Sequence, residues 1–143
     1  MAALSASRSF KRAGTNRRLT KVPVAANAVI WHGAIVAVNA AGYAVAANDA
    51  TVGLKVVGIC WNTPVNNTGG ANGAIFVDVV EGDYEMVNAG GAITQALLFK
   101  AVHVSDDQSV TTAAVATNDI VAGIAVDITA TTVVVRFSAD YGI

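Results

Sequence analysis

Residues 22–60 read VPVAANAVIWHGAIVAVNAAGYAVAANDATVGLKVVGIC, and this stretch decides the fold. Short runs of valine, isoleucine and alanine alternate in it with turn residues such as Asn27, Gly33 and Asn48. This alternation is typical of short strands in a chain that folds back on itself repeatedly. Pro23 cannot donate a hydrogen bond to a neighbouring strand, so the first strand should lie at an edge or at the start of a sheet. The pattern predicts strands at residues 22–24, 28–31, 34–38, 43–46 and 55–61.

The remainder of the chain continues the same pattern. The longest irregular stretch, residues 62–73, is rich in Asn, Gly and Thr and is expected to form a surface loop. Residues 81–83, Glu-Gly-Asp, predict a hairpin turn between two strands, and a short helical turn is expected only within residues 92–102. Further strands are predicted at residues 74–80, 84–87, 102–104, 110–114, 120–128 and 132–137.

The last predicted strand has a clear inward face. In TVVVRF, residues 132–137, alternation places Val133, Val135 and Phe137 towards the core and Val134 and Arg136 outwards. The last strand of the fold is therefore predicted to be half-buried.

Two parts of the chain resemble each other at an offset of about 66 residues. Val-Ala-Val at 36–38, a turn, a short strand, Asn-Asp at 48–49 and Val-Gly-Ile at 57–59 are echoed by Val-His-Val at 102–104, Asn-Asp at 118–119 and Ala-Gly-Ile at 122–124. Valine-rich strands resemble one another easily. Two interpretations remain open: a duplicated β-meander, or a chance likeness.

Composition indicates one domain with an all-β fold. The chain has 143 residues, 54% of them hydrophobic, which is enough to bury a core. We expect a small β-barrel or a β-tulip or sandwich of about 8–11 short strands, with an extended N-terminal arm. No window of 18 residues is free of polar or turn residues, so no transmembrane helix is expected. Cys60 is the only cysteine, which excludes an intrachain disulfide and favours a reducing compartment.

The charges are distributed unevenly. Six of the nine basic residues lie within residues 1–21, whereas all ten acidic residues lie at Asp49 or later. This predicts a basic arm, residues 1–20, attached to an acidic body, residues 21–143. The arm could be a solvated tail, dock on an acidic protein surface or contact nucleic acid, although nucleic acid is not the expected partner; neither a secretory signal nor a transit peptide is expected. The candidate partner-binding residues are Arg8, Phe10, Lys11, Arg12, Arg17, Arg18 and Lys21.

Residues able to perform catalysis are scarce. His32 and His103 are the only histidines, and each lies beside an apolar strand, where a structural role is expected. Cys60, between Ile59 and Trp61, is expected to be a small buried hydrophobic side chain. The chain contains no GxSxG, HExxH, GxGxxG or P-loop pattern. We therefore expect no enzymatic activity, no cofactor and no metal site.

The four acidic residues at 78–85 have a spacing that fits no EF-hand loop and are interpreted as a solvated face. Trp31 and Trp61 are the largest side chains of the chain. They are expected either to fill the core or to anchor an interface.

Four elements in order give the chain a family likeness: the opening VPVAANAVIWHG, the strand VVGIC, the hairpin VSDDQSVTT and the segment NDIVAGIAVDI. Together with EGDYEM and the closing TVVVRF, over about residues 20–137, they resemble the small capsid cement or decoration proteins of tailed bacteriophages. The resemblance implies a small β-barrel or β-tulip domain on the outer surface of an icosahedral capsid, where it joins adjacent major capsid protein subunits. It carries over no catalytic residue. The basic arm is longer than such a domain needs.

The partners expected from this resemblance are the major capsid protein and further copies of the chain, with a trimer favoured and a dimer possible. Two other functions stay open. One is another phage structural role, in the tail or neck. The other is a β-domain that binds carbohydrate or another small ligand through Trp31, Trp61 and residues 62–73.

Overall fold

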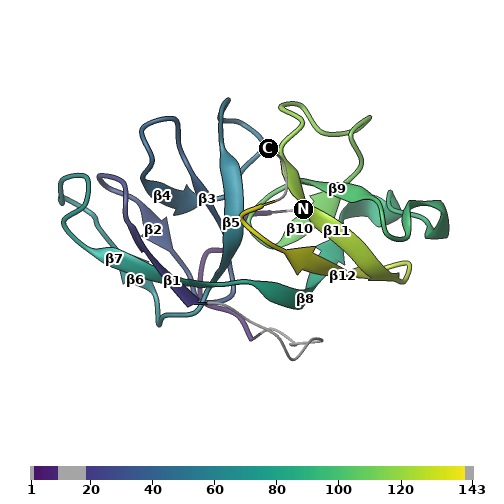
Figure 1. Ribbon diagram of the computed structural model, residues 1–143, viewed down its shortest axis with the longest axis horizontal. Coiled ribbons are helices and arrows are strands. Elements are labelled where there is room, and N and C mark those ends of the chain that lie inside the picture. Colours follow the sequence, from purple (N-terminus) through teal and green to yellow (C-terminus); the bar gives the residue numbers. More distant parts are fainter. Residues whose placement is uncertain (1, 10–18, 141–143) are drawn as a thin grey trace.

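The computed structural model describes residues 2–9 and 19–140, and this part of the chain is all-β, as the sequence predicts. The strands form two halves that lie side by side along the long axis of the molecule (Figure 1). The first half contains β1 (Leu19–Pro23), β2 (Val29–Ile30), β3 (Ile35–Val38), β4 (Ala44–Ala46), β5 (Lys55–Cys60), β6 (Val65–Asn66) and β7 (Phe76–Val80). The second half contains β8 (Gly82–Asn88), β9 (Ala101–Val104), β10 (Ser109–Thr111), β11 (Val121–Ile128) and β12 (Thr132–Phe137).

The twelve strands of the described residues are one more than the highest predicted number, because β6, a strand of two residues, was not predicted; β2, expected at residues 28–31, also has only two residues. The pair β2–β6 is antiparallel and joins Val29 to Asn66 and Ile30 to Val65. Residues 62–73 therefore do not form a loop throughout, as the sequence suggested, but contribute β6. The predicted helical turn is present as a short 3-10 helix, η2 (Gln95–Leu97), and a second one, η1 (Ala89–Gly91), precedes it.

The two halves have the same strand order. In the first half the order is β1-β7-β5-β3-β4, and a parallel bridge between Val24 and Ala44 brings the end of β1 back to β4. In the second half β8-β12-β11-β9-β10 forms a closed barrel, in which β10 pairs with β8 in parallel. Each strand of the first order thus has its counterpart in the second.

Individual hydrogen bonds repeat as well. The amide of Asn39 donates to the carbonyl oxygen of Tyr43 at 2.9 Å, and 66 residues later Ser105 donates to Ser109 at 3.0 Å. Gly33 donates to Cys60 at 3.0 Å, and Phe99 donates to Ala125 at 2.7 Å. Phe99 even adopts the positive φ of Gly33, 60° against 85°. The internal likeness of the sequence is therefore a structural duplication.

The predicted hairpin at residues 81–83 is wrong. β7 pairs with β1 and β5, whereas β8 pairs with β12 and β10, so the chain passes from one half to the other at Glu81. The reason is that Val79 is buried in the first core and Val80 in the second, so both faces of β7 are covered. The chain therefore continues from β7 into the second half and does not fold back beside it. The buried carboxylate of Glu81 accepts a hydrogen bond from the amide of Ala139 at 2.6 Å.

Each half has its own hydrophobic core. The first core lies inside the first half and includes Val36, Cys60 and Val77. The second core fills the second barrel and extends onto the opposite faces of β3 and β5, where Ile35 and Ile59 are fully buried. Because β3 is covered on both faces, residues 35–37 form an uninterrupted apolar run. In β12, Val133, Val135 and Phe137 are buried and Arg136 is exposed, which confirms the predicted inward face.

Candidate interaction surface

A group of exposed apolar side chains lies on the outer side of β1 and β7. Opposite residues of an antiparallel pair project from the same side of a sheet, and here Pro23 lies opposite Phe76 and Lys21 opposite Asp78. Phe76 is 54% exposed and Leu19, at the start of β1, is 57% exposed. We call this surface the Phe76 face; its members are Leu19, Lys21, Pro23, Trp61, Phe76 and Asp78.

Trp61 extends the Phe76 face beyond the end of β5. Its amide donates to the carbonyl oxygen of Asp78 at 2.8 Å, which places Trp61 opposite Asp78 and beside the row that contains Phe76. The Trp61 residue is 38% exposed, and its ring lies 6.3 Å from that of His32. The Nδ1 atom of His32 lies 3.1 Å and 3.0 Å from the carbonyl oxygens of Trp61 and Asn62, so it carries the proton and donates. These bonds fix the backbone that carries the tryptophan.

One ion pair crosses the Phe76 face. The Nζ atom of Lys21 lies 3.0 Å from Oδ1 of Asp78, and the side chain of Asn62 donates to Oδ2 of Asp78 at 3.1 Å. The amide of Asp78 in turn donates to the side-chain oxygen of Asn62. The Lys21 side chain is 72% exposed, and an exposed pair of this kind contributes only about 0–1 kcal/mol to stability. Lys21 is thus largely exposed beside its partner Asp78, which lies between it and Trp61.

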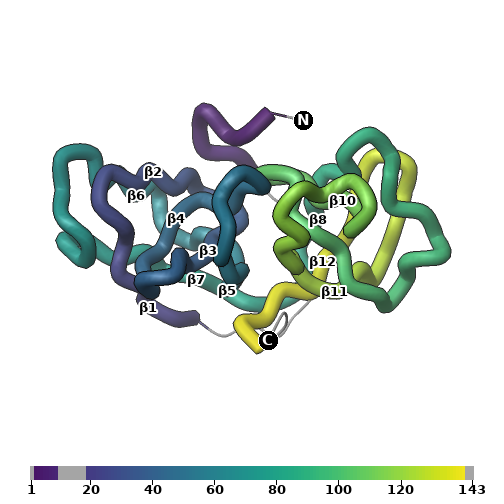
Figure 2. Tube along the Cα trace, turned by 90° about the horizontal axis from the view of Figure 1, so that it is seen from above, coloured from purple at the N-terminus to yellow at the C-terminus, as the bar shows by residue number. Residues whose placement is uncertain are grey.

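Residues 2–9 lie against the body of the same chain, across the seam between its two halves (Figure 2). On the second half, the amide of Leu4 donates to Oδ1 of Asp107 at 2.7 Å, and Gln108 donates to the carbonyl oxygen of Ala2 at 2.7 Å. On the first half, the amide of Arg8 donates to the carbonyl oxygen of His32 at 3.2 Å. The half-buried side chain of Leu4 packs against the first core. This segment therefore fastens the two halves together.

Arg8 is enclosed where this segment crosses the second half. Its guanidinium donates to the carbonyl oxygen of Glu85 at 3.1 Å and approaches Sδ of Met86 at 3.7 Å. Burial lowers the pKa of Arg8, while the nearby carboxylates of Asp107 and Glu85 oppose that change. Burial likewise raises the pKa of Asp107, which the hydrogen bond from Leu4 partly offsets. Arg8, predicted as a partner-binding residue, makes these contacts within its own chain.

Of the other predicted partner-binding residues of the arm, the structure describes Lys21. Lys21 belongs to β1, which begins at Leu19, two residues before the predicted boundary at residue 21. Phe10, Lys11, Arg12, Arg17 and Arg18 lie outside the described residues. In the sequence, residues 11–18 contain four basic residues and directly precede Leu19, which lies at one end of the Phe76 face.

The tryptophans differ in exposure. Trp61 lies on the Phe76 face, and Trp31, in the connection between β2 and β3, is half-buried. Neither is a member of the first or second core. Phe76 and Leu19 were not among the sequence candidates. The signal for Phe76 was available, since alternation in residues 74–80 places it beside Asp78 rather than with Val77 and Val79.

The remaining candidate groups have structural partners. Cys60 is buried, as predicted, and burial raises its pKa to about 11. His103 pairs through Nε2 with Oδ1 of Asp119 at 3.0 Å. Within residues 2–9 and 19–140, no three His, Cys, Asp or Glu side chains gather as a metal site. Nor does that part of the chain contain a helix long and apolar enough to span a membrane.

Comparison with protein-family models, curated proteins and solved structures finds no match to this chain.

Proposed function

We propose that this chain is a structural protein of a tailed-phage virion that binds the outer surface of the capsid and joins adjacent major capsid protein subunits. The observation that carries the proposal is the Phe76 face, which exposes two aromatic side chains, Phe76 and Trp61, and begins at Leu19, directly after the basic stretch of residues 11–18 in the sequence. Exposed aromatic side chains beside a basic residue are typical of protein-binding surfaces. The four sequence elements that resemble cement proteins support the same function.

The proposed contact has an apolar and an electrostatic part. Phe76 and Trp61 lose solvent exposure against the capsid, and the basic residues 11–18 lie on acidic capsid surface. Each site can be modest, because a protein that repeats its contacts over many copies of a shell gains strength through multivalency. Self-association, with a trimer favoured over a dimer, would add to this effect. Catalysis and cofactors play no part in the proposed function.

The test is sedimentation of the purified chain with expanded, empty capsids of the phage that encodes it. We expect Phe76→Asp to reduce the bound fraction at least tenfold, because a charge replaces an apolar contact at the centre of the interface. Val115→Asp is the matched control, since Val115 is 66% exposed, on the β10–β11 connection of the second half. Replacing Lys11, Arg12, Arg17 and Arg18 by serine should weaken binding mainly at low salt.

Equal binding of wild type and Phe76→Asp would overturn the role of the Phe76 face. If the wild type does not sediment with capsids but does sediment with tails or necks of the same phage, the chain belongs to those structures instead. If the chain binds neither capsids nor tails or necks but binds carbohydrate, the small-ligand alternative is favoured.

A further inference from the structure

Phe99 occupies a turn position that ordinarily requires glycine. The turn begins at Leu97, the last residue of η2, and the amide of Lys100 donates to the carbonyl oxygen of Leu97 at 2.9 Å. Leu98 has φ −56° and ψ 130°, and Phe99 has φ 60°. This is the conformation of a type II turn, whose third residue needs a positive φ. Glycine adopts a positive φ readily, whereas a residue with a Cβ atom does so at a conformational cost.

The first half has glycine at the equivalent turn. Gly33 has a φ of 85° and donates to the carbonyl oxygen of Cys60 at 3.0 Å, and the amide of Cys60 donates to Ala34 at 2.9 Å. In the second half Phe99 donates to Ala125 at 2.7 Å, and the amide of Ala125 donates to the residue after Phe99 at 3.1 Å. The two turns thus have the same backbone bonds and differ in the residue at the positive φ.

The side chain of Phe99 gains little burial in the fold. Phe99 is 65% exposed and belongs to neither of the two hydrophobic cores of the described residues. Residues held at an unfavourable φ gather at functional sites, where the surrounding structure keeps them in place. The backbone bonds to Ala125 on both sides of this residue provide such support. The cost and the exposure together indicate that the ring contacts another molecule.

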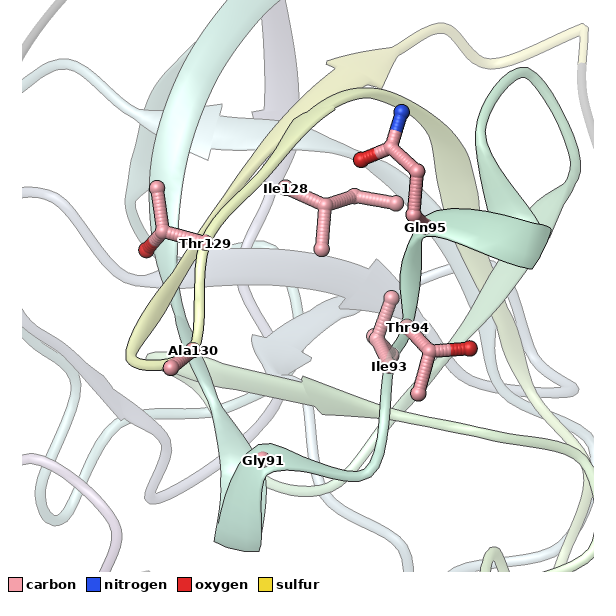
Figure 3. A pocket seen from close by; sticks show the side chains of 7 residues that line it. All are labelled: Gly91, Ile93, Thr94, Gln95, Ile128, Thr129 and Ala130. Atoms are coloured by element: carbon pink, nitrogen blue, oxygen red, sulfur yellow. The ribbon is translucent and has the colours of Figure 1, made fainter.

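The turn lies at one end of the molecule. It follows η2, which begins at Gln95, and Gln95 lines a hollow of about 350 Å³ between the segment after β8 and the turn that joins β11 to β12 (Figure 3). In Figure 1 the segment between β8 and β9 lies at the end of the long axis opposite to β1 and β7. Phe99 and the Phe76 face are therefore presented at opposite ends. Lys100, directly after Phe99, is also exposed.

We infer that Phe99 anchors a second contact with the capsid, on a major capsid protein subunit next to the one that the Phe76 face binds. The inference rests on the proposed function and assigns the part of the chain that reaches the second subunit. The duplication argues for a partner of the same kind. Trp61 directly follows the residue that pairs with Gly33, so each half exposes one aromatic side chain beside the same turn. The fitting surface is an apolar recess beside a carboxylate, which receives the ring and pairs with Lys100.

A site at each end makes the molecule bivalent. One exposed aromatic side chain gives a weak contact, and two linked contacts can raise the apparent affinity about a hundredfold or more above that of either contact alone. A chain that has lost the Phe99 contact still binds through the Phe76 face. It then holds one subunit and does not join two.

The first test compares the capsid binding of Phe99→Gly and wild type by sedimentation with expanded, empty capsids of the phage that encodes the chain. Glycine removes the ring and suits the turn, so the urea midpoint of unfolding should stay the same or rise. The apparent affinity for capsids should fall at least tenfold. Phe99→Tyr keeps the ring and should bind within about twofold of the wild type. Val115→Gly is the matched control and should bind like the wild type, since Val115 is 66% exposed in the same half.

Reinforcement of the shell is the second readout. At protein concentrations that give equal occupancy of the capsids, the wild type should slow the disassembly of the shells on heating at least fivefold more than Phe99→Gly does. A difference at equal occupancy separates the joining of two subunits from binding to one.

The outcomes separate this inference from the proposed function. If Phe99→Gly binds and protects capsids like the wild type while Phe76→Asp is impaired, this inference is wrong and the proposed function stands. A lower urea midpoint for Phe99→Gly would mean that the ring serves the fold, which also overturns the inference. So would a variant that loses self-association in sedimentation velocity but keeps its capsid binding, because the ring would then contact a second copy. If the wild type does not bind capsids, both proposals fail.

Discussion

Gly58 and Gly123 occupy the same position in the two halves of the molecule. A Cβ atom added at Gly58 of β5 would collide with the carbonyl oxygen of Val80 and lie 2.7 Å from Cγ1 of Val79. A Cβ atom added at Gly123 of β11 would collide with the carbonyl oxygen of Arg136 and lie 2.8 Å from Cγ1 of Val135. Both glycines lie at irregularities in strand pairing. The duplicated fold thus uses the same close approach of backbones twice.

We expect Gly58→Ala and Gly123→Ala each to lower the free energy of unfolding by roughly 1–3 kcal/mol, because the added methyl group meets backbone that cannot move aside. Gly58→Ala should cost more, since Gly58 also has a φ of +150°. Gly42→Ala is the control: Gly42 has a φ of +89° but nothing within 4 Å of an added Cβ, so it isolates the cost of conformation. Urea unfolding measures all three. A cost at Gly123 no greater than about 0.5 kcal/mol would contradict the equivalence.

Leu4 should contribute to the stability of the whole molecule. It is half-buried against the first core, and its amide is bonded to the second half, so Leu4→Ala is expected to lower the free energy of unfolding by about 1–2 kcal/mol. Ser5→Ala, at an exposed neighbouring position, should change it by less than about 0.5 kcal/mol. Equal stability of the two variants in urea unfolding would show that the segment does not stay docked in solution.

The titration of Asp107 should make stability fall as pH rises. Burial raises its pKa in the folded protein, so the folded state binds more protons than the unfolded state between about pH 4 and that raised value. The contribution of Asp107 to the free energy of unfolding is fully present below this pH window and is lost as the pH rises through it. Asp107→Asn keeps an acceptor for the amide of Leu4 but does not titrate. The difference in unfolding free energy, wild type minus variant, should decrease between pH 4 and pH 7; a constant difference would refute this.

Cys60 should react slowly with thiol reagents. With a pKa of about 11, only about a thousandth of the thiol is ionised at pH 8, and the side chain is fully buried in the first core. We expect the rate with a disulfide reagent at pH 8 to be at least a hundredfold lower for the folded chain than for the chain in urea. Similar rates in both conditions would mean that the first half opens readily.

The sequence predicted the strands well where alternation or apolar runs were bounded by turn residues, as in residues 34–38, 55–61 and 132–137. For the internal likeness, a duplication was one of the two interpretations that the sequence left open. The partners of strands were harder to predict, because residues 76–80 and 82–88 fit a hairpin locally and only the burial of Val80 in a second core separates them. Local pattern does not encode which sheet a strand joins.

The contacts of the N-terminal segment could not be predicted for a similar reason. The bond from Leu4 to Asp107 links residues 103 positions apart, and a run of serine, alanine and arginine carries no sign of such a partner. The Phe76 face was missed because its residues come from β1, from β7 and from the end of β5, and the sequence did not reveal how these strands pair. Of its members, the sequence suggested Trp61 from its size and Lys21 from its charge.

The passage of the chain through Glu81 has a mechanical consequence. β7 and β8 follow each other with one residue between them, so the covalent connection from β7 to β8 is a single residue long. β7 forms antiparallel pairs with β1 and β5, and β8 forms one with β12, with hydrogen bonds perpendicular to the strands. Tension between the two ends of the molecule would load these bonds together, in shear, instead of opening them one at a time. We therefore expect the molecule to resist stretching along its long axis.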